Sequence, residues 1–223
     1  LGAAAVFSGI TTRTWEGVRG ELKADDALAI VRPDSGPYLV STTAIAVENT
    51  HNFGGGTIQP LEEIKKLSEG AKSMGIALHL DGARLWNAHI ATGISLHEYG
   101  KYFDTVSVCL SKGLGAPIGS VLLSTKEKIV SARQWRKRYG GGMRQVGILA
   151  AAAHYALDTN LPLLADDHRR AHAISLACQK VSPSIVNAEH VKTNIVALDL
   201  NPTTLTGAQL AEKLREQGIL SSA

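Results

Sequence analysis

Three short polar clusters in this chain combine residue types that could perform chemistry, and each follows an apolar run typical of a buried strand. They are ENTHN at 48–52, DGAR at 81–84 and SKG at 111–113. In a mostly parallel sheet, the carboxyl ends of the strands meet at one edge, where loops converge and helix N-termini bind anions. The spacing of the clusters therefore predicts a single site at that edge.

Lys112 is the best candidate for a nucleophile in these clusters. Desolvation and neighbouring cations at the end of a buried strand lower the pKa of a lysine, which leaves a neutral amine able to form a Schiff base. Taken alone, Lys112 is more simply explained as a lysine that reaches solvent.

Asp81, one strand–helix unit before Lys112, changes that balance. A buried carboxylate costs free energy unless a cation is beside it. The protonated ring nitrogen of pyridoxal 5′-phosphate is such a cation, and the ion pair keeps the ring an effective electron sink. The two residues together predict this cofactor.

The elements that must position these clusters follow from the hydrophobic pattern. Apolar runs rich in β-branched residues alternate with amphipathic runs, which favours an α/β fold with a mostly parallel sheet between layers of helices. The predicted strands are 42–48, 76–81, 103–110 and 119–124, and the predicted helices are 61–75, 126–138 and 145–157.

The pattern changes after residue 157, where we expect a helix, a strand at 194–200 and a helix at 206–218. Thr206 is a suitable N-cap for the last helix and Gly218 a suitable stop. We therefore expect a large domain at 1–157 and a smaller C-terminal α/β domain at 158–223. Both are interpreted as partial, because the opening LGAAAVFSGI has neither an initiator Met nor a basic leader.

Composition excludes several classes of protein. The 23 Lys and Arg residues nearly balance the 20 Asp and Glu residues, so no overall field indicates nucleic acid or an anionic membrane. No apolar run reaches the length of a membrane span. The two cysteines form no CxxC or Cys/His cluster, so neither a metal site nor a disulfide framework is expected, and a cytoplasmic location fits best.

Four motifs between about residues 45 and 157 carry a resemblance to a known family. LHLDGARLWNA, VSVCLSKGLGAPIGS and WRKRYGGGMRQVGILAAAAHYAL, preceded by ENTHNFGGGTIQP, resemble the low-specificity L-threonine aldolases in order and spacing. These are fold-type-I pyridoxal phosphate enzymes, close to β-eliminating lyases. The resemblance implies a transferase-like fold and cleavage of L-threonine or L-allo-threonine to glycine and an aldehyde.

The resemblance also implies roles for individual residues. Lys112 would bind the cofactor aldehyde, and Asp81 would pair with the ring nitrogen. Arg84 would bind the substrate carboxylate or the cofactor's phenolic oxygen, a task that suits its fork of donors. Ser111 would touch the cofactor phosphate or the Schiff-base region.

His51 lies where the family places a histidine close to the substrate side chain. An imidazole is suited to take the β-hydroxyl proton, although a water or a histidine outside this chain could do the same. Glu48 and Asn49 would shape the pocket, with Glu48 on the substrate side. His79 is expected to be a satisfied core histidine. The family's phosphate-binding segment and its C-terminal carboxylate-binding arginine have no counterpart that we can assign in this chain.

The basic segment 133–144 allows two interpretations. By the resemblance, Lys137 and Arg144 would reach the phosphate or substrate of a neighbouring subunit, within a homo-oligomer that is a dimer of dimers with shared active sites. Alternatively, its cations and aromatic residues could bind RNA. A different fold-type-I enzyme, such as a serine hydroxymethyltransferase-like protein or a β-eliminating lyase, and a cofactor-free structural relative remain further alternatives.

Overall fold

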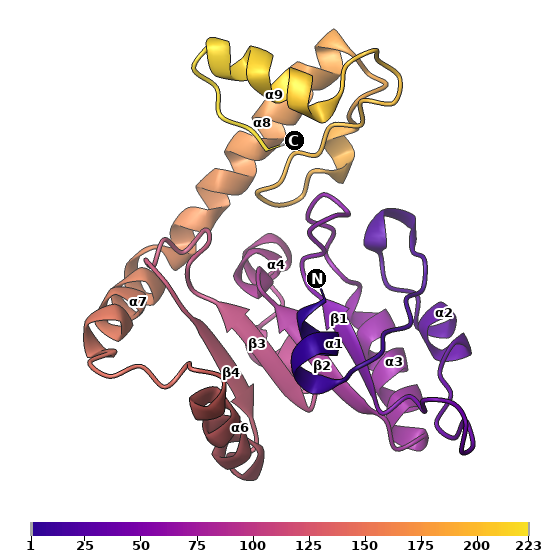
Figure 1. The fold of residues 1–223 in the computed structure, drawn as a ribbon. Coiled ribbons are helices and arrows are strands. Elements are labelled where there is room, and N and C mark those ends of the chain that lie inside the picture. Colours follow the sequence, from indigo (N-terminus) through magenta and orange to yellow (C-terminus); the bar gives the residue numbers. More distant parts are fainter. Residues whose placement is uncertain (1, 223) are drawn as a thin grey trace.

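A four-stranded sheet forms the centre of the computed structural model, which describes residues 2–222. The strands are β1 (Ala44–Glu48), β2 (Ala77–Gly82), β3 (Thr105–Cys109) and β4 (Ser120–Ser124), in the order β1-β2-β3-β4 (Figure 1). The first three are parallel, and β4 runs antiparallel to β3. Three of them lie within the ranges predicted from the sequence, β2 extends one residue beyond its predicted end at 81, and the predicted α/β class is confirmed.

Connection lengths explain these directions. Parallel neighbours need a crossover, and helix α3 (Leu61–Ser73) supplies it between β1 and β2, while α4 (Leu85–Thr92) and α5 (Leu96–Gly100) supply it between β2 and β3. The loop at 110–119 contains no helix and is too short for a crossover. The chain therefore returns antiparallel as β4.

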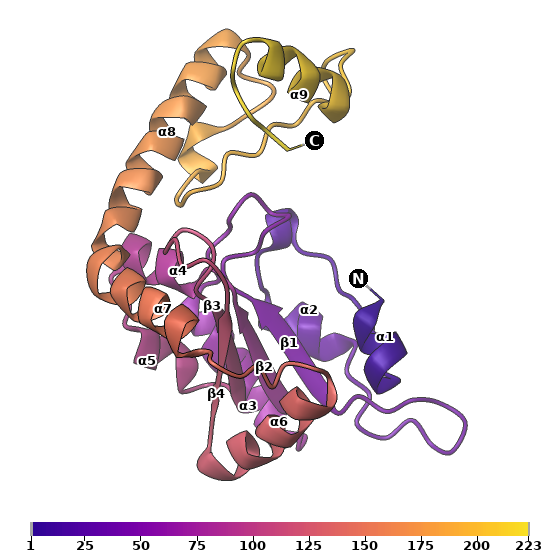
Figure 2. The same cartoon turned by 60° about the vertical axis from the view of Figure 1, so that its left-hand side comes forward.

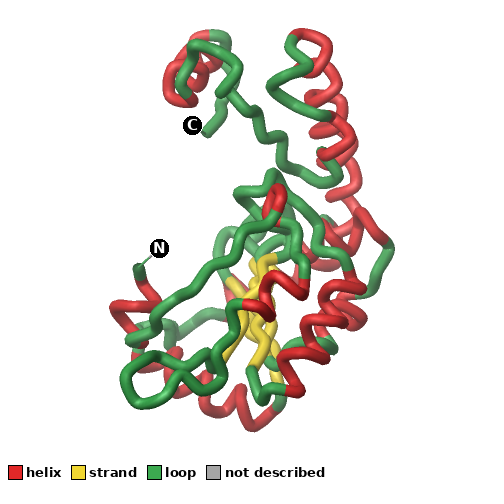
Figure 3. The backbone as a smooth tube through the Cα atoms, turned by 90° about the vertical axis from the view of Figure 1, so that its right-hand side faces the viewer, coloured by secondary structure: helices red, strands yellow, loops and turns green. Residues whose placement is uncertain are grey.

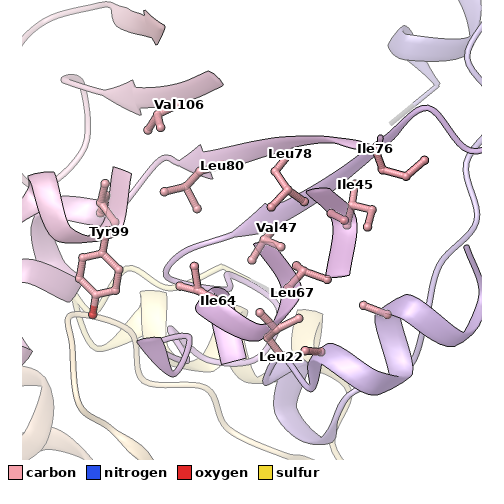
Figure 4. Close-up of a cluster of buried hydrophobic side chains, with 14 of the residues drawn as sticks. Leu22, Ile45, Val47, Ile64, Leu67, Ile76, Leu78, Leu80, Tyr99 and Val106 are labelled. Atoms are coloured by element: carbon pink, nitrogen blue, oxygen red, sulfur yellow. The ribbon is translucent and has the colours of Figure 1, made fainter. Parts of the chain in front are cut away.

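Alternating apolar side chains of the sheet build the main core. Ile45, Val47, Leu78 and Leu80 are buried on one face, while Ala44, Ala46 and Ala77 on the opposite face are exposed. Figure 4 shows these buried side chains with those of helix α3, where Ile64 and Leu67 are fully buried. The short helix α2 (Ala24–Ala29) packs on α3.

Helices α6 (Lys126–Arg138) and α7 (Gly147–Thr159) follow β4. Helix α6 is capped at its N-terminus by Thr125, whose hydroxyl accepts the N–H of Lys128. Helix α7 packs through Ala153 and Ala156. The other short elements are α1 (Ala3–Ser8) and the 3₁₀ turns Val18–Gly20, Leu161–Leu163 and Ala188–His190. No helix within residues 2–222 is long and apolar enough to cross a membrane.

A long helix, α8 (Leu164–Val181), carries the chain from the sheet to a second, smaller unit that ends with α9 (Gly207–Glu216) (Figures 1 and 2). Thr206 and Gln209 form a reciprocal capping box, so the predicted N-cap is confirmed. A small core between α8 and this unit contains Ala171 of α8 with Val186 and Val191. We call residues 182–222 the C-terminal unit.

The predicted strand at 194–200 is wrong. Residues 195–200 are irregular, and the tube in Figure 3 draws them as loop. A strand needs a neighbour to satisfy its backbone groups, and this segment has only isolated bonds, such as Asp199 N–H to Ile185 O at 2.8 Å. The domain boundary at 158 stays a prediction, since Leu164 in α8 still packs with Leu110 and Ala153.

Candidate active site

The sheet brings the three polar clusters to one edge, as their spacing predicts. Residues 48–52 begin with the last residue of β1, residues 81–84 begin with the last two residues of β2, and residues 111–113 follow β3. Glu48 is the direct lateral partner of Asp81, and the N–H of Asn49 donates to Asp81 O at 2.9 Å. The β1 and β2 clusters are therefore fixed to each other by the ladder itself.

Asp81 differs from expectation in its burial. Its side chain is exposed in this chain, because the residue lies on the open face of the sheet. Its Oδ1 accepts the N–H of Ala83 at 3.1 Å, which orients the carboxylate. None of the ion pairs formed within residues 2–222 includes Asp81. The carboxylate is therefore available to a cation from outside the described chain.

Arg84 occupies the N-cap position of α4, two residues after β2 ends, so it lies at the same edge of the sheet. Its Nε is buried and has no hydrogen-bond partner in the part of the chain that the structure describes. Trp86 holds this helix against β3, since its Nε1 donates to Cys109 O at 2.8 Å. A buried guanidinium nitrogen without a partner is costly, and an anionic ligand would satisfy it.

Lys112 and Ser111 lie in the loop after β3, and both are exposed. Leu114 anchors this loop in the core at 1% exposure, and Asn160 Nδ2 donates to Leu114 O at 2.8 Å. The N–H of Gly115 donates to Lys112 O at 2.8 Å and closes the turn. The lysine amine therefore projects from a loop whose backbone is held.

Glu48 and His51 form the third part of the site. Glu48 Oε1 accepts the N–H of Asn52 at 3.1 Å, and Glu48 Oε2 lies 4.0 Å from His51 Nε2. The two side chains are 29% and 30% exposed. Asn49, fully buried, accepts the N–H of Gln59 through Oδ1 at 3.2 Å. Asn49 therefore links the two ends of the loop between residues 49 and 59 from its buried side.

Gln59 is a residue that the sequence did not single out. It is 2% exposed, and its Nε2 donates to Gly20 O and to Glu48 O, both at 3.0 Å. Its Oε1 accepts the N–H of Leu22 at 2.7 Å. A lone amide in the apolar stretch TIQP was the only available signal. The side chain ties residues 20–22 to the first cluster.

His79 behaves as a satisfied histidine close to the site. Its Nδ1 lies 2.7 Å from Thr105 Oγ1, and it shares the open face of β2 with Asp81. Burial lowers its pKa, and the charge of Asp81 partly opposes this. His79 is therefore held neutral near neutral pH.

Lys137 and Arg144 lie outside this cluster. Both are exposed, Lys137 near the end of α6 and Arg144 in the connection that follows. Within residues 2–222, neither side chain forms a hydrogen bond or ion pair with the three clusters. In the same segment Trp135 stacks on Tyr139 with centroids 5.6 Å apart, and Arg138 lies 4.8 Å over Trp135. These aromatic faces already have partners within the chain.

Comparison with known proteins identifies the family of this chain. Residues 1–201 match the family model described as beta-eliminating lyase. The chain is 44% identical over 201 residues to "Low-specificity L-threonine aldolase 1" of Arabidopsis thaliana, which covers 90% of this chain and 56% of the relative. It is 35% identical over 223 residues to "Low specificity L-threonine aldolase" of Escherichia coli K12, which covers 100% of this chain and 64% of the relative.

Solved structures give the same result. A Listeria monocytogenes EGD-E protein assigned as an L-allo-threonine aldolase superposes with a TM-score of 0.71 at 26% identity, over 86% of this chain and 51% of that one. The chain thus spans between half and two thirds of the length of these relatives. With its α/β fold, its three clusters at one sheet edge and a match over residues 1–201, the chain belongs to the beta-eliminating lyase family.

Proposed function

We propose that this protein is a pyridoxal 5′-phosphate-dependent carbon–carbon lyase that cleaves L-threonine and L-allo-threonine to glycine and an aldehyde. One observation carries the proposal. Asp81 and Lys112 lie at the ends of the neighbouring strands β2 and β3, and no ion pair within residues 2–222 includes either. The similarity to aldolases at 35–44% identity supports the choice of substrate.

The residues present fit the cofactor. Pyridoxal phosphate has a protonatable ring nitrogen, an aldehyde and an anionic phosphate. The free carboxylate of Asp81 suits the first, the amine of Lys112 the second, and the buried unpartnered Nε of Arg84 suits an anionic oxygen of cofactor or substrate. When bound, the cofactor supplies an electron sink for the pair left on Cα after the Cα–Cβ bond breaks.

The chain's own residues bind and orient the cofactor and the substrate. Asp81 would pair with the ring nitrogen and favour its protonated form, and Lys112 would hold the cofactor through its amine. Arg84 binds the substrate carboxylate through its fork of donors, which fixes the bond that breaks. Ser111 lies beside Lys112 and contacts the cofactor phosphate or the Schiff-base region. The β-hydroxyl proton goes to His51, to a water or to another base.

Assembly and location belong to the same proposal. We expect a homo-oligomer, a dimer of dimers, in which the exposed Lys137 and Arg144 reach the site of a neighbouring subunit. We also expect a cytoplasmic location, which the two free cysteines, Cys109 and Cys178, support because thiols persist in a reducing compartment.

The absorption spectrum of the purified protein with and without borohydride tests the cofactor and its attachment. We expect an absorption band of a protein-bound Schiff base that borohydride removes, and glycine with acetaldehyde as products from threonine. Lys112→Ala should abolish both the band and the turnover, whereas Lys72→Ala, at an exposed lysine on α3, should change neither. A wild-type protein without the band would contradict the proposal.

A β-eliminating lyase is the second candidate, because the matching family model carries that description. Such an enzyme, like a serine hydroxymethyltransferase-like protein, would use the same lysine and aspartate. Product analysis separates the candidates: an aldolase forms glycine from threonine and allo-threonine, whereas an eliminating lyase releases ammonia and pyruvate from serine or cysteine.

A further inference from the structure

A groove lies between the loop after β1 and the C-terminal unit. It has a volume of about 500 Å³, which is within the usual range of small-molecule sites in proteins. Its lining comes from Arg19 and residues 53–55 on the side of the sheet, and from residues 183–187, 190–191 and 197–199 of the C-terminal unit. Of the described residues, those that line the groove do not include Asp81, Arg84 or Lys112. The groove is therefore separate from the proposed cofactor site.

Hydrogen bonds fix the two sides of the groove relative to each other. Arg19 Nη2 donates to His190 O at 3.1 Å, and Thr193 Oγ1 donates to Gly56 O at 3.2 Å. The backbone of Arg19 is held from the loop after β1, because Thr57 Oγ1 donates to Arg19 O at 2.8 Å. The groove therefore exists before any ligand binds, which reduces the entropy cost of binding.

Arg19 supplies a cation to this groove. Its backbone φ of +56° lies in the left-handed region, which residues other than glycine seldom adopt and which is often found at ligand-binding positions. Burial lowers the pKa of the guanidinium, and the charge of Glu21 partly opposes this. Within residues 2–222, Arg19 belongs to no ion pair, and its side chain donates one hydrogen bond, to His190 O. The remaining donors of its fork are available to a carboxylate.

Asp199 supplies the opposite charge. Its side chain is exposed, and its Oδ1 accepts the N–H of Asn201 at 2.9 Å. No ion pair within residues 2–222 includes Asp199. The rest of the lining includes the apolar side chains of Phe53, Val186 and Leu198. Apolar walls with a few charged groups are typical of sites for small organic ligands.

The balance of charge indicates the class of ligand. One arginine and one aspartate are the permanently charged residues of the lining, and together they match a zwitterion with one carboxylate and one ammonium group. A phosphate ester, with about two negative charges near neutral pH, would be repelled by Asp199. The apolar side chains favour a ligand that also carries an apolar group.

We propose that this groove binds a free α-amino acid with an aliphatic side chain, whose carboxylate pairs with Arg19 and whose ammonium group pairs with Asp199. The aliphatic side chain lies against Phe53, Val186 and Leu198. The inference goes beyond the proposed function, because it requires neither the cofactor nor the cleavage reaction.

Isothermal titration calorimetry with L-leucine tests the proposal. The protein is first treated with borohydride, which fixes bound cofactor to Lys112 and so prevents leucine from binding there. We expect one site with a Kd of about 0.1–1 mM. Arg19→Gln and Asp199→Asn should each weaken binding about tenfold or more, because each removes a charged partner of the ligand. Arg215→Gln, at an exposed arginine of α9, should leave the Kd unchanged.

Two analogues of leucine test the two charges separately. Isocaproate has the leucine skeleton without the amino group, and isoamylamine has it without the carboxylate. Each should bind the wild-type protein about tenfold or more weakly than leucine. Asp199→Asn should not weaken the binding of isocaproate further, and Arg19→Gln should not weaken that of isoamylamine. Isocaproate that binds as tightly as leucine would overturn the assignment of an amino acid.

Two results of the leucine titration overturn the proposal: no saturable binding up to about 10 mM, or the same Kd in the wild type and in both groove variants. Circular dichroism checks that each variant is folded. If Arg19→Gln does not fold, Asp199→Asn and the two analogues still decide the outcome. If the protein does not cleave threonine, the proposed function fails, while the leucine titration still decides whether the groove is a binding site.

Discussion

The side-chain amide of Asn87 lies 3.0 Å from Nε2 of His168, and this contact joins α4 to α8. Asn87 is 2% exposed and lies one helical turn after Arg84, while His168 is half-buried near the start of α8. The contact therefore links the helix that follows the DGAR cluster to the helix that carries the C-terminal unit.

This contact predicts an acid-sensitive contribution to stability. Burial lowers the pKa of His168, and the Asp167 carboxylate partly offsets this. Because the folded-state pKa lies below the value of about 6.5 for an unfolded chain, the contribution is present above that value and is lost as pH falls through the folded-state pKa. Protonation also removes the acceptor for the Asn87 amide.

Urea unfolding at about pH 7.5 and about pH 5.5 tests this. Wild-type protein should lose more stability between the two than His168→Gln. His79, whose pKa is also lowered by burial, is present in both proteins, so its contribution to the pH dependence of stability cancels in the comparison. An equal loss of stability in the wild type and the His168→Gln variant would show that His168 contributes nothing to this pH dependence.

The carboxylate of Asp104 predicts a second stability effect. Its Oδ2 accepts Leu78 N–H at 2.9 Å, and its Oδ1 pairs with Lys128 Nζ at 2.6 Å. Asp104→Ala should cost about 1–2 kcal/mol of unfolding free energy, because it leaves a backbone donor unpaired. Asp104→Asn keeps an acceptor for Leu78 and loses only an exposed ion pair, so about 1 kcal/mol or less is expected. Denaturation midpoints compare the two variants.

Substitution of Gly56 is expected to weaken the attachment of the C-terminal unit to the rest of the chain. Its φ is +82°, and a Cβ there would lie 2.5 Å from Thr193 Oγ1, which donates to Gly56 O at 3.2 Å. Gly75 has a φ of +68° with open space around it. Gly75→Ala therefore measures the conformational cost, about 1–2 kcal/mol. Gly56→Ala should cost more and should speed proteolysis between residues 182 and 206; equal effects would contradict this.

Cys109 predicts a chemical difference between the two cysteines. Burial raises the pKa of its thiol, but hydrogen bonds with Ser111 and Ser120 and the charge of Lys112 outweigh this, and the pKa is below its usual value. Since the thiolate is the nucleophile, Cys109 should react with iodoacetamide several-fold faster than Cys178, both being partly exposed. Ser111→Ala should slow the reaction of Cys109 with iodoacetamide, because it removes a hydrogen bond that lowers the pKa of the thiol. Mass spectrometry of peptides after timed labelling measures both rates.

The sequence predicted the elements whose signal is local. The strands at 44–48 and 77–82 and helix α3 follow from hydrophobic periodicity, and Thr206 from capping chemistry. The clusters meet because each ends a neighbouring strand. The strand at 194–200 was wrong because Val196 and Leu198 pack in a small core without a partner strand, and a run of apolar residues cannot show whether a neighbour exists.

Contacts between distant residues were beyond the sequence. Asp81 was expected to be buried, but its strand face is open within residues 2–222. The bonds of Gln59 to Gly20 and Leu22 join positions nearly forty residues apart. The bond from Gly54 to His51 depends on loop geometry that no periodicity encodes. The site's location was predictable, but the hydrogen bonds that hold its loops were not.

The C-terminal unit is fastened to the rest of the chain in more than one place. Helix α8 connects to it (Figure 2), and in addition Arg19 Nη2 donates to His190 O at 3.1 Å and Thr193 Oγ1 donates to Gly56 O at 3.2 Å. A rotation of this unit about the end of α8 would therefore break the bonds to Arg19 and Gly56, and Gly56 N–H in turn donates to His51 O in the first polar cluster.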